Sequence, residues 1–147
     1  MNKFKWISII PVSFCVISLL CVFTPIPALA GEYIGDFCWA FSHLALDISG
    51  VIKLGISHMG GDHYTCSGVI TVTNPTFMQF PAYGNAELLA GKIYITLSLA
   101  GIRNGVIGID MIKATLNPDL SGTFESIGVY ADAVELSEGG LTSTTCQ

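Results

Sequence analysis

Two histidines flank a short glycine-containing segment near the middle of the chain. His58 and His63 enclose residues 59–62, which end in Asp62. If these four residues form a hairpin loop, the two imidazoles face each other across a strand pair with a carboxylate nearby. Such a group can bind zinc, copper or nickel, but His43 is the only other histidine and polar residues at a barrel rim give the same pattern. We therefore expect no metal or other cofactor, and His58 and His63 remain the candidate ligands.

Carboxylates in predicted strands are the candidates for acid–base catalysis, which needs groups whose environments push their pKa values apart. Asp110 points either into the protein or to solvent, depending on whether Ile109 and Met111 face outward or inward. Glu87 and Glu125 also lie in predicted strands, and none of the three carboxylates has a partner at a recognisable spacing. The sequence therefore predicts a protein that is not an enzyme. A small enzyme that uses Asp110 is the alternative.

The cysteines limit the disulfide chemistry. Three of the five cysteines, Cys38, Cys66 and Cys146, lie after residue 30. They allow one intramolecular disulfide and leave one thiol over. No base lies at a spacing that identifies a catalytic cysteine, so we expect their role to be structural.

The first thirty residues have the three parts of a secretory signal peptide. A start with two lysines precedes the uncharged residues 6–23, and an A-x-A sequence ends at Ala30. We expect cleavage after Ala30 and secretion, or export to the periplasm, from a bacterial cell. Residues 1–30 are then the signal peptide and residues 31–147 the mature domain. An uncleaved membrane anchor is the alternative.

Composition excludes several classes of protein. The whole chain is 51% hydrophobic, which excludes a disordered protein. Residues 31–147 contain four basic and eleven acidic residues, a net charge of −7. No cluster of Lys and Arg is present to neutralise phosphates, so nucleic-acid binding is excluded. Low charge with abundant Thr, Ser and Gly favours an extracytoplasmic β protein over one with charged surface helices.

Alternation with period two dominates residues 31–147 and predicts strands. It is clearest in residues 92–100, and glycine-rich or Asn-Pro sequences lie between the alternating runs, where turns are expected. Residues 77–83, which include Pro81, are predicted to form an irregular loop. The predicted strands are residues 36–42, 51–58, 63–73, 84–89, 92–100, 105–116, 122–130 and 141–146.

About eight short strands with tight connections predict an all-β fold, a single antiparallel up-and-down β-barrel. A β-sandwich is the alternative, but a Greek key needs a long return connection. An outer-membrane barrel also alternates, with its apolar residues toward lipid. Its strands need about 9–11 residues, whereas several predicted strands have six or seven. We therefore expect no stable membrane insertion of the mature domain. The sequence leaves the oligomeric state open.

The predicted barrel suggests which cysteines pair. The last strand of a closed eight-stranded meander lies beside the first, which brings Cys146 near Cys38. A disulfide between them closes a loop of about 108 residues and contributes on the order of 4 kcal/mol. A disulfide between Cys66 and Cys146, or three reduced thiols, are the alternatives.

The residues from Gly35 to Trp39 resemble the start of the first strand in the calycin group, the lipocalin-like and avidin-like barrels. In that group one residue separates the glycine from the tryptophan, whereas three separate them here. The resemblance implies an eight-stranded barrel whose mouth or interior holds a small apolar molecule.

An alternating face rich in aromatic residues is the candidate ligand site. We expect ligand binding by burial in a preformed apolar cavity of about 300 Å³ or more, without chemistry. A structural or interaction barrel with a filled core is the alternative. The candidate ligand-binding residues are Trp39, Phe41, Leu54, Ile56, Tyr64, Ile95, Leu97 and Phe124.

Overall fold

The computed structural model describes residues 31–103, 106–131 and 133–146. The predicted signal peptide, residues 1–30, lies outside the described residues. Within them the secondary structure is entirely β, as the period-two alternation predicts. The strands are β1 (Glu32–His43), β2 (Ser49–Gly60), β3 (His63–Asn74), β4 (Met78–Leu89), β5 (Lys92–Arg103), β6 (Val106–Leu116), β7 (Gly122–Val129) and β8 (Val134–Thr144).

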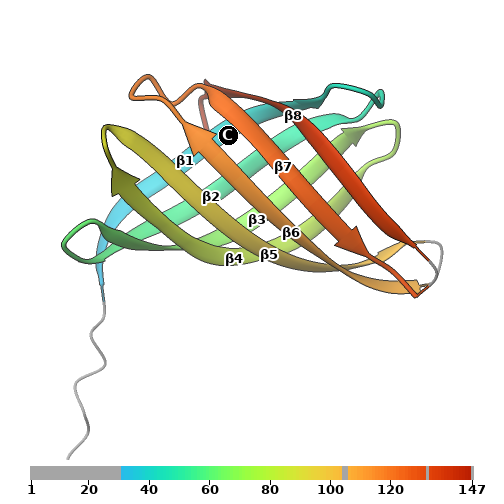
Figure 1. Ribbon diagram of the computed structural model, residues 1–147, viewed down its shortest axis with the longest axis horizontal. Coiled ribbons are helices and arrows are strands. Elements are labelled where there is room, and N and C mark those ends of the chain that lie inside the picture. The colour runs from blue at the N-terminus through green and yellow to red at the C-terminus, as the bar shows by residue number, and fades with distance from the viewer. Residues whose placement is uncertain (1–30, 104–105, 132, 147) are drawn as a thin grey trace, which may run out of the picture. The chain divides into compact units, whose positions relative to one another are not determined.

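The eight strands form one closed antiparallel barrel in sequence order (Figure 1). Each strand pairs with the next, and β8 returns to pair with β1 from Cys38↔Thr144 to His43↔Gly139. Closure gives both terminal strands a hydrogen-bonded neighbour on each side and removes the exposed sheet edges. The up-and-down barrel is therefore confirmed, and the β-sandwich alternative is wrong.

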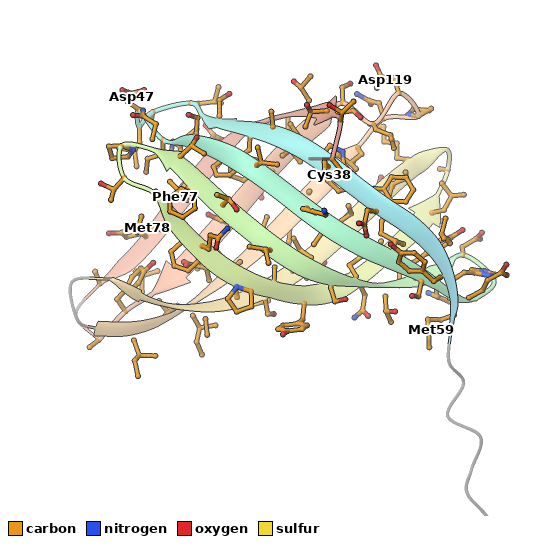
Figure 2. All side chains as sticks on the ribbon, turned by 180° about the vertical axis from the view of Figure 1, so that it is seen from behind. Cys38, Asp47, Met59, Phe77, Met78 and Asp119 are labelled. Atoms are coloured by element: carbon orange, nitrogen blue, oxygen red, sulfur yellow. A yellow bond between two sulfur atoms is a disulfide. The ribbon has the colours of Figure 1, made fainter. Side chains whose placement is uncertain are left out.

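The connections divide between the two ends of the barrel. Connections 61–62, 90–91 and 117–121 lie at one end, which we call the cavity end, and connections 44–48 and 75–77 lie at the other, the far end. Figure 2 shows Met59 and Asp119 at the cavity end and Asp47, Phe77 and Met78 at the far end.

Side chains alternate between the inside and the outside of the barrel along each strand. In β5, Ile95, Leu97 and Leu99 are buried, whereas the intervening Thr96 and Ser98 are exposed. The outer faces of β1 to β5 carry mainly Ser, Thr, Gly and charged residues. The inward residues form the hydrophobic core. The fully buried members with the largest side chains are Leu54, Leu97 and Leu116.

This polarity reverses in the far-end half of β6, β7 and β8. Ile109, Met111 and Leu136 are exposed on the outside. Inside, the hydroxyls of Ser126 and Ser137 are 2.5 Å apart. Over this region the barrel has a polar interior and an apolar exterior.

A tyrosine fixes the orientation of these strands. The Tyr130 hydroxyl donates to the Asp110 carboxylate, at 3.2 Å from Oδ2. Its ring occupies the space that a Cβ on Gly108 would need, at 2.3 Å, and a Cβ on Gly128 would lie 2.3 Å from Asp110 Oδ1. Larger residues at the two glycines would displace the tyrosine or the aspartate. Asp110 is thereby held on the inner face.

Two strands, β4 and β8, begin well before the residues predicted from the sequence, whereas the other strand boundaries differ by four residues or fewer. Residues 77–83 do not form a loop, because β4 begins at Met78 and contains Pro81. Pro81 pairs with Val69 of β3, whereas the pairing of β4 with β5 begins at Ala82. Proline is tolerated where only one neighbouring strand is paired. β8 begins at Val134 rather than at residue 141, in the region where polarity is reversed.

The predicted disulfide joins Cys38 on β1 to Cys146, which follows β8, at the point where the barrel closes. Their Cα atoms are 5.3 Å apart and 108 residues separate them in sequence. The third cysteine of the described residues, Cys66, is a buried free thiol in the core. No helix in the described part of the chain is long and apolar enough to cross a membrane.

We predict that reducing this disulfide destabilises the barrel by about 4 kcal/mol, because the cross-link restricts the unfolded chain over a long loop. Denaturant unfolding with and without reductant measures the difference. The Cys66→Ala variant is the control, since it keeps the disulfide and should lose the same amount on reduction. An unchanged unfolding free energy in reductant would contradict the prediction.

Candidate functional site

The barrel encloses an apolar cavity of about 130 Å³ near the cavity end. Its wall is built from strands β1 to β6 and from connection 117–121. Ile34 and Leu88 on this wall are partly exposed, at 50% and 40%, so the cavity reaches the surface there. The lining residues are Ile34, Phe37, Trp39, Ile56, Tyr64, Leu88, Ile93, Ile95, Leu116 and Leu120.

Half of the predicted ligand-binding residues lie on this wall. They are Trp39, Ile56, Tyr64 and Ile95.

The structure places the other four predicted residues in the packed interior, outside the lining. Leu54 and Leu97 are only 1% and 2% exposed and fill the core. Phe41 and Phe124 pack edge to face, with ring centroids 6.0 Å apart. Alternation identifies the inward residues of a regular strand, but it does not separate those beside the cavity from those in the packed part.

The hydrogen bond between Trp39 and connection 117–121 fixes the wall at the cavity end. The Trp39 indole Nε1–H donates to the Leu120 carbonyl at 3.0 Å. Leu120 has a φ of 63°, in the left-handed region that a non-glycine residue adopts only at a cost. The hydrogen bond therefore holds Leu120 in a strained conformation in which it lines the cavity.

Hydrogen bonds inside the same connection support that conformation. The Asn117 N–H donates to the Ser121 carbonyl at 2.7 Å, and the Leu120 N–H donates to the Asn117 carbonyl at 2.9 Å. The Ser121 hydroxyl donates to Asp119 Oδ1 at 2.6 Å, and the Ser121 N–H to the same oxygen at 3.0 Å. These two bonds to the charged carboxylate lower the pKa of Asp119. Asp119 is therefore ionised at neutral pH, and the connection keeps both hydrogen bonds to its carboxylate.

Few polar groups lie on the cavity wall. The Trp39 indole is already bonded to Leu120. The Tyr64 hydroxyl has no hydrogen-bond partner among the described residues, and the Tyr64 ring packs against His58 with centroids 5.1 Å apart. The wall therefore offers apolar contact to a ligand and one hydroxyl for a hydrogen bond.

The sequence left several wall residues out of the predicted site. Ile93 lies on the same face of its strand as Ile95, and Phe37 on the same face as Trp39, so alternation alone would find them. Ile34 lies at a register shift between Tyr33 and Gly35, which breaks the alternation of β1. Leu120 lies in a turn sequence, and no periodic signal marks it as a wall residue.

The two candidate metal ligands do not face each other. The β2–β3 connection contains only residues 61–62, and the cross-strand partner of His58 is Tyr64. His58 Nε2 lies 2.8 Å from the Gly61 carbonyl, whereas His63 Nδ1 lies 3.3 Å from Glu87 Oε1. Residues 59 and 60 belong to β2, so the condition for facing imidazoles, a hairpin loop over residues 59–62, is not met. No group of three metal-ligating side chains occurs among the described residues.

The three candidate carboxylates lie apart. Asp110 faces the interior and accepts from Tyr130. Glu87 is on the outer face beside His63, and Glu125 is exposed on the outer face of β7, where its cross-strand partner is Lys113. The arrangement brings no pair of these carboxylates together for acid–base chemistry.

Comparison of the chain with known protein families, with curated proteins and with solved structures found no match. The description of the site therefore depends on the geometry of this chain.

The Cys66 thiol gives a test of how closed the interior is. Burial raises the pKa of Cys66 to about 11, so little thiolate, the nucleophilic form, exists at neutral pH. We predict that iodoacetamide does not label native Cys66 at pH 8 and labels it fully after unfolding. Peptide mass spectrometry measures the labelled fraction. Rapid labelling of the native protein at pH 8 would show that the interior is open to solvent.

Proposed function

We propose that this protein is an exported β-barrel that binds a small apolar molecule, or the apolar end of a larger one, in the cavity at its cavity end. The observation that carries the proposal is a preformed cavity, reached from the surface, whose wall is apolar except for the Tyr64 hydroxyl and the engaged Trp39 indole. Binding transfers apolar ligand surface out of water into this site. No bond is made or broken.

The cavity volume limits the size of the ligand. The cavity volume of about 130 Å³ is smaller than the volume of about 300 Å³ or more expected from the sequence for ligand binding. An apolar protein cavity of about 150 Å³ is large enough for benzene. The proposed ligand is therefore a single ring, a short branched alkyl group, or a group of that size at the end of a longer molecule that extends past Leu88.

The Tyr64 hydroxyl favours a ligand with one polar atom. The Tyr64 hydroxyl is accessible to solvent and has no protein partner among the described residues, so a hydrogen bond from the ligand would replace one to water and add a modest gain to the apolar contact. A small phenol, alcohol or ketone whose oxygen reaches Tyr64 fits both the apolar wall and this hydroxyl. We therefore propose that weakly polar molecules bind more tightly than pure hydrocarbons of the same size.

The lipocalin-like character and the exported location belong to this proposal. A closed eight-stranded up-and-down barrel is the architecture of the calycin group, in which barrel interiors hold small molecules. The Cys38–Cys146 disulfide is compatible with a periplasmic or extracellular location, because disulfides persist in oxidising compartments. The proposed cleavage after Ala30 would release the barrel at that location.

The polarity of the barrel favours this reading over an outer-membrane barrel. The strands have 8 to 12 residues, so the sequence-based argument from short strands is wrong. The better argument is that the interior is mostly apolar and the outer faces of β1 to β5 are mostly polar. A barrel surrounded by lipid needs an apolar band around its whole outer surface.

Isothermal titration with probes of graded size tests the proposal. We predict that phenol and toluene bind one per chain, with dissociation constants of about 0.1–1 mM, equivalent to about 4–5.5 kcal/mol. Naphthalene, which is larger than the cavity, should bind more weakly than either. Binding of none of the three probes would contradict the proposal.

Two neighbouring leucines provide a matched pair of variants for the same titration. Leu88 lines the cavity, whereas Leu89 does not, and both are exposed. We expect Leu88→Trp to fill the cavity mouth and weaken binding at least about tenfold, a loss of about 1.4 kcal/mol. Leu89→Trp should leave binding unchanged. Equal effects of the two variants would place the bound probe elsewhere.

A further inference from the structure

Six apolar side chains form two rows across the outside of β6, β7 and β8. Cross-strand pairing aligns Ile109, Val129 and Val134 in one row, and Met111, Ile127 and Leu136 in the next. Each of the six is between 45% and 75% exposed. We call this surface the outer apolar patch. It lies toward the far end, away from the cavity.

The polar side chains inside the barrel explain why the apolar side chains of the patch are exposed. Asp110 and Tyr130 are hydrogen-bonded on the inner face of the same strands, and Ser126 lies beside Ser137. A shift of one residue in register would exchange the two faces of a strand. The strands instead keep the polar side chains inside, so their apolar face remains outside and uncovered in the isolated chain.

The size and shape of the patch suit one protein partner. The six side chains are neighbours and each is 45% to 75% exposed, and a contiguous apolar surface of this kind on a folded protein marks a contact site. Each partner contributes about 800 Å² to a stable interface, so a partner on this surface would cover the polar border as well as the apolar patch. The patch covers one side of the barrel only, so it fits a partner that docks on one face better than a surrounding bilayer.

The charges that border the patch are self-complementary. The next row toward the cavity end contains Lys113 on β6, Glu125 on β7 and Glu138 on β8, all exposed. Neither Lys113 nor Glu138 forms an ion pair with another described residue. The row is therefore positive at one side of the patch and negative at the other.

A two-fold axis that runs along β7, between two copies of the chain, brings the opposite charges of this row together. Such an axis places β6 of one copy opposite β8 of the other, so Lys113 of each copy meets Glu138 of its partner. Ile127 and Val129 meet their own counterparts, and the remaining apolar side chains pair between β6 and β8. The two Glu125 side chains meet at the border of the contact, where solvent screens their repulsion.

We propose that this protein forms a symmetric homodimer through the outer apolar patch, with the two-fold axis along β7. The dimer covers the apolar exterior of β6 to β8 and leaves both cavities open, because the cavities are at the other end of each barrel. Sheet-on-sheet contact of this kind leaves the strands of the two copies within about 30° of each other.

Sedimentation equilibrium of the purified protein tests the proposal with a matched pair of variants. Val129 lies on the proposed axis, whereas Val69 is an exposed outward valine on β3, away from the patch. We expect a dimer for the unmodified protein and for Val69→Lys, and a monomer for Val129→Lys. Near-ultraviolet circular dichroism checks that both variants keep the native fold. A monomeric unmodified protein, or equal behaviour of two folded variants, would overturn the proposal.

Charge reversal tests the direction of the axis. Lys113→Glu and Glu138→Lys each bring like charges together and should weaken the dimer at least about tenfold. The double variant carries both changes and should recover the original dissociation constant. Failure of the double variant to recover it would contradict the proposed axis. Flotation of the protein with phosphatidylcholine vesicles, in the absence of a dimer, would overturn the proposal and identify lipid as the partner.

Discussion

The pairing of β8 with β1 is the constraint on which the rest of the structure depends. It turns a linear series of hairpins into a ring, so that every strand has an inside and an outside. The Cys38–Cys146 disulfide joins the segments on the two sides of that closure and holds them together in the unfolded chain as well. Without closure, the inward side chains of β1 and β8 would lie at two open sheet edges, and the core would lack a continuous wall.

Closure alone does not decide what the interior contains. At the cavity end, large apolar side chains from β1 to β6 surround an open volume, and the Trp39–Leu120 hydrogen bond holds the connection that lines it. At the far end of β6 to β8, a tyrosine, an aspartate and two serines occupy the interior, and the apolar residues lie outside. The barrel thus has an apolar cavity inside one end and an exposed apolar patch outside the other.

Much of this fold follows from the sequence, because period-two alternation and turn residues act locally. Alternation identifies Trp39, Ile56 and Ile95 as inward residues, and a closed meander predicts the Cys38–Cys146 pair. Alternation does not predict the orientation of Asp110, because an inward and an outward Asp110 both fit the pattern of its strand. The orientation is decided by Tyr130, which is 20 residues away in sequence. Local patterns contain no information about that contact.

The other features that the sequence did not predict also depend on strand register or on contacts between residues far apart in the sequence. Leu120 reaches the cavity through a left-handed backbone and a hydrogen bond from a residue 81 positions earlier. Pro81 is accommodated because the pairing of β4 with β5 begins only after it. His58 and His63 are separated by a register shift and a two-residue turn, neither of which the residue spacing reveals. Each case depends on a register or a long-range contact.

The central claim is that the barrel keeps a preformed apolar cavity against Trp39. X-ray diffraction from crystals pressurised with xenon tests this most directly, because xenon enters apolar protein cavities that exclude water. The account predicts one xenon site per chain in contact with Trp39, Ile95 and Leu116. A cavity that holds ordered water and no xenon, or side chains that close it, would contradict the account.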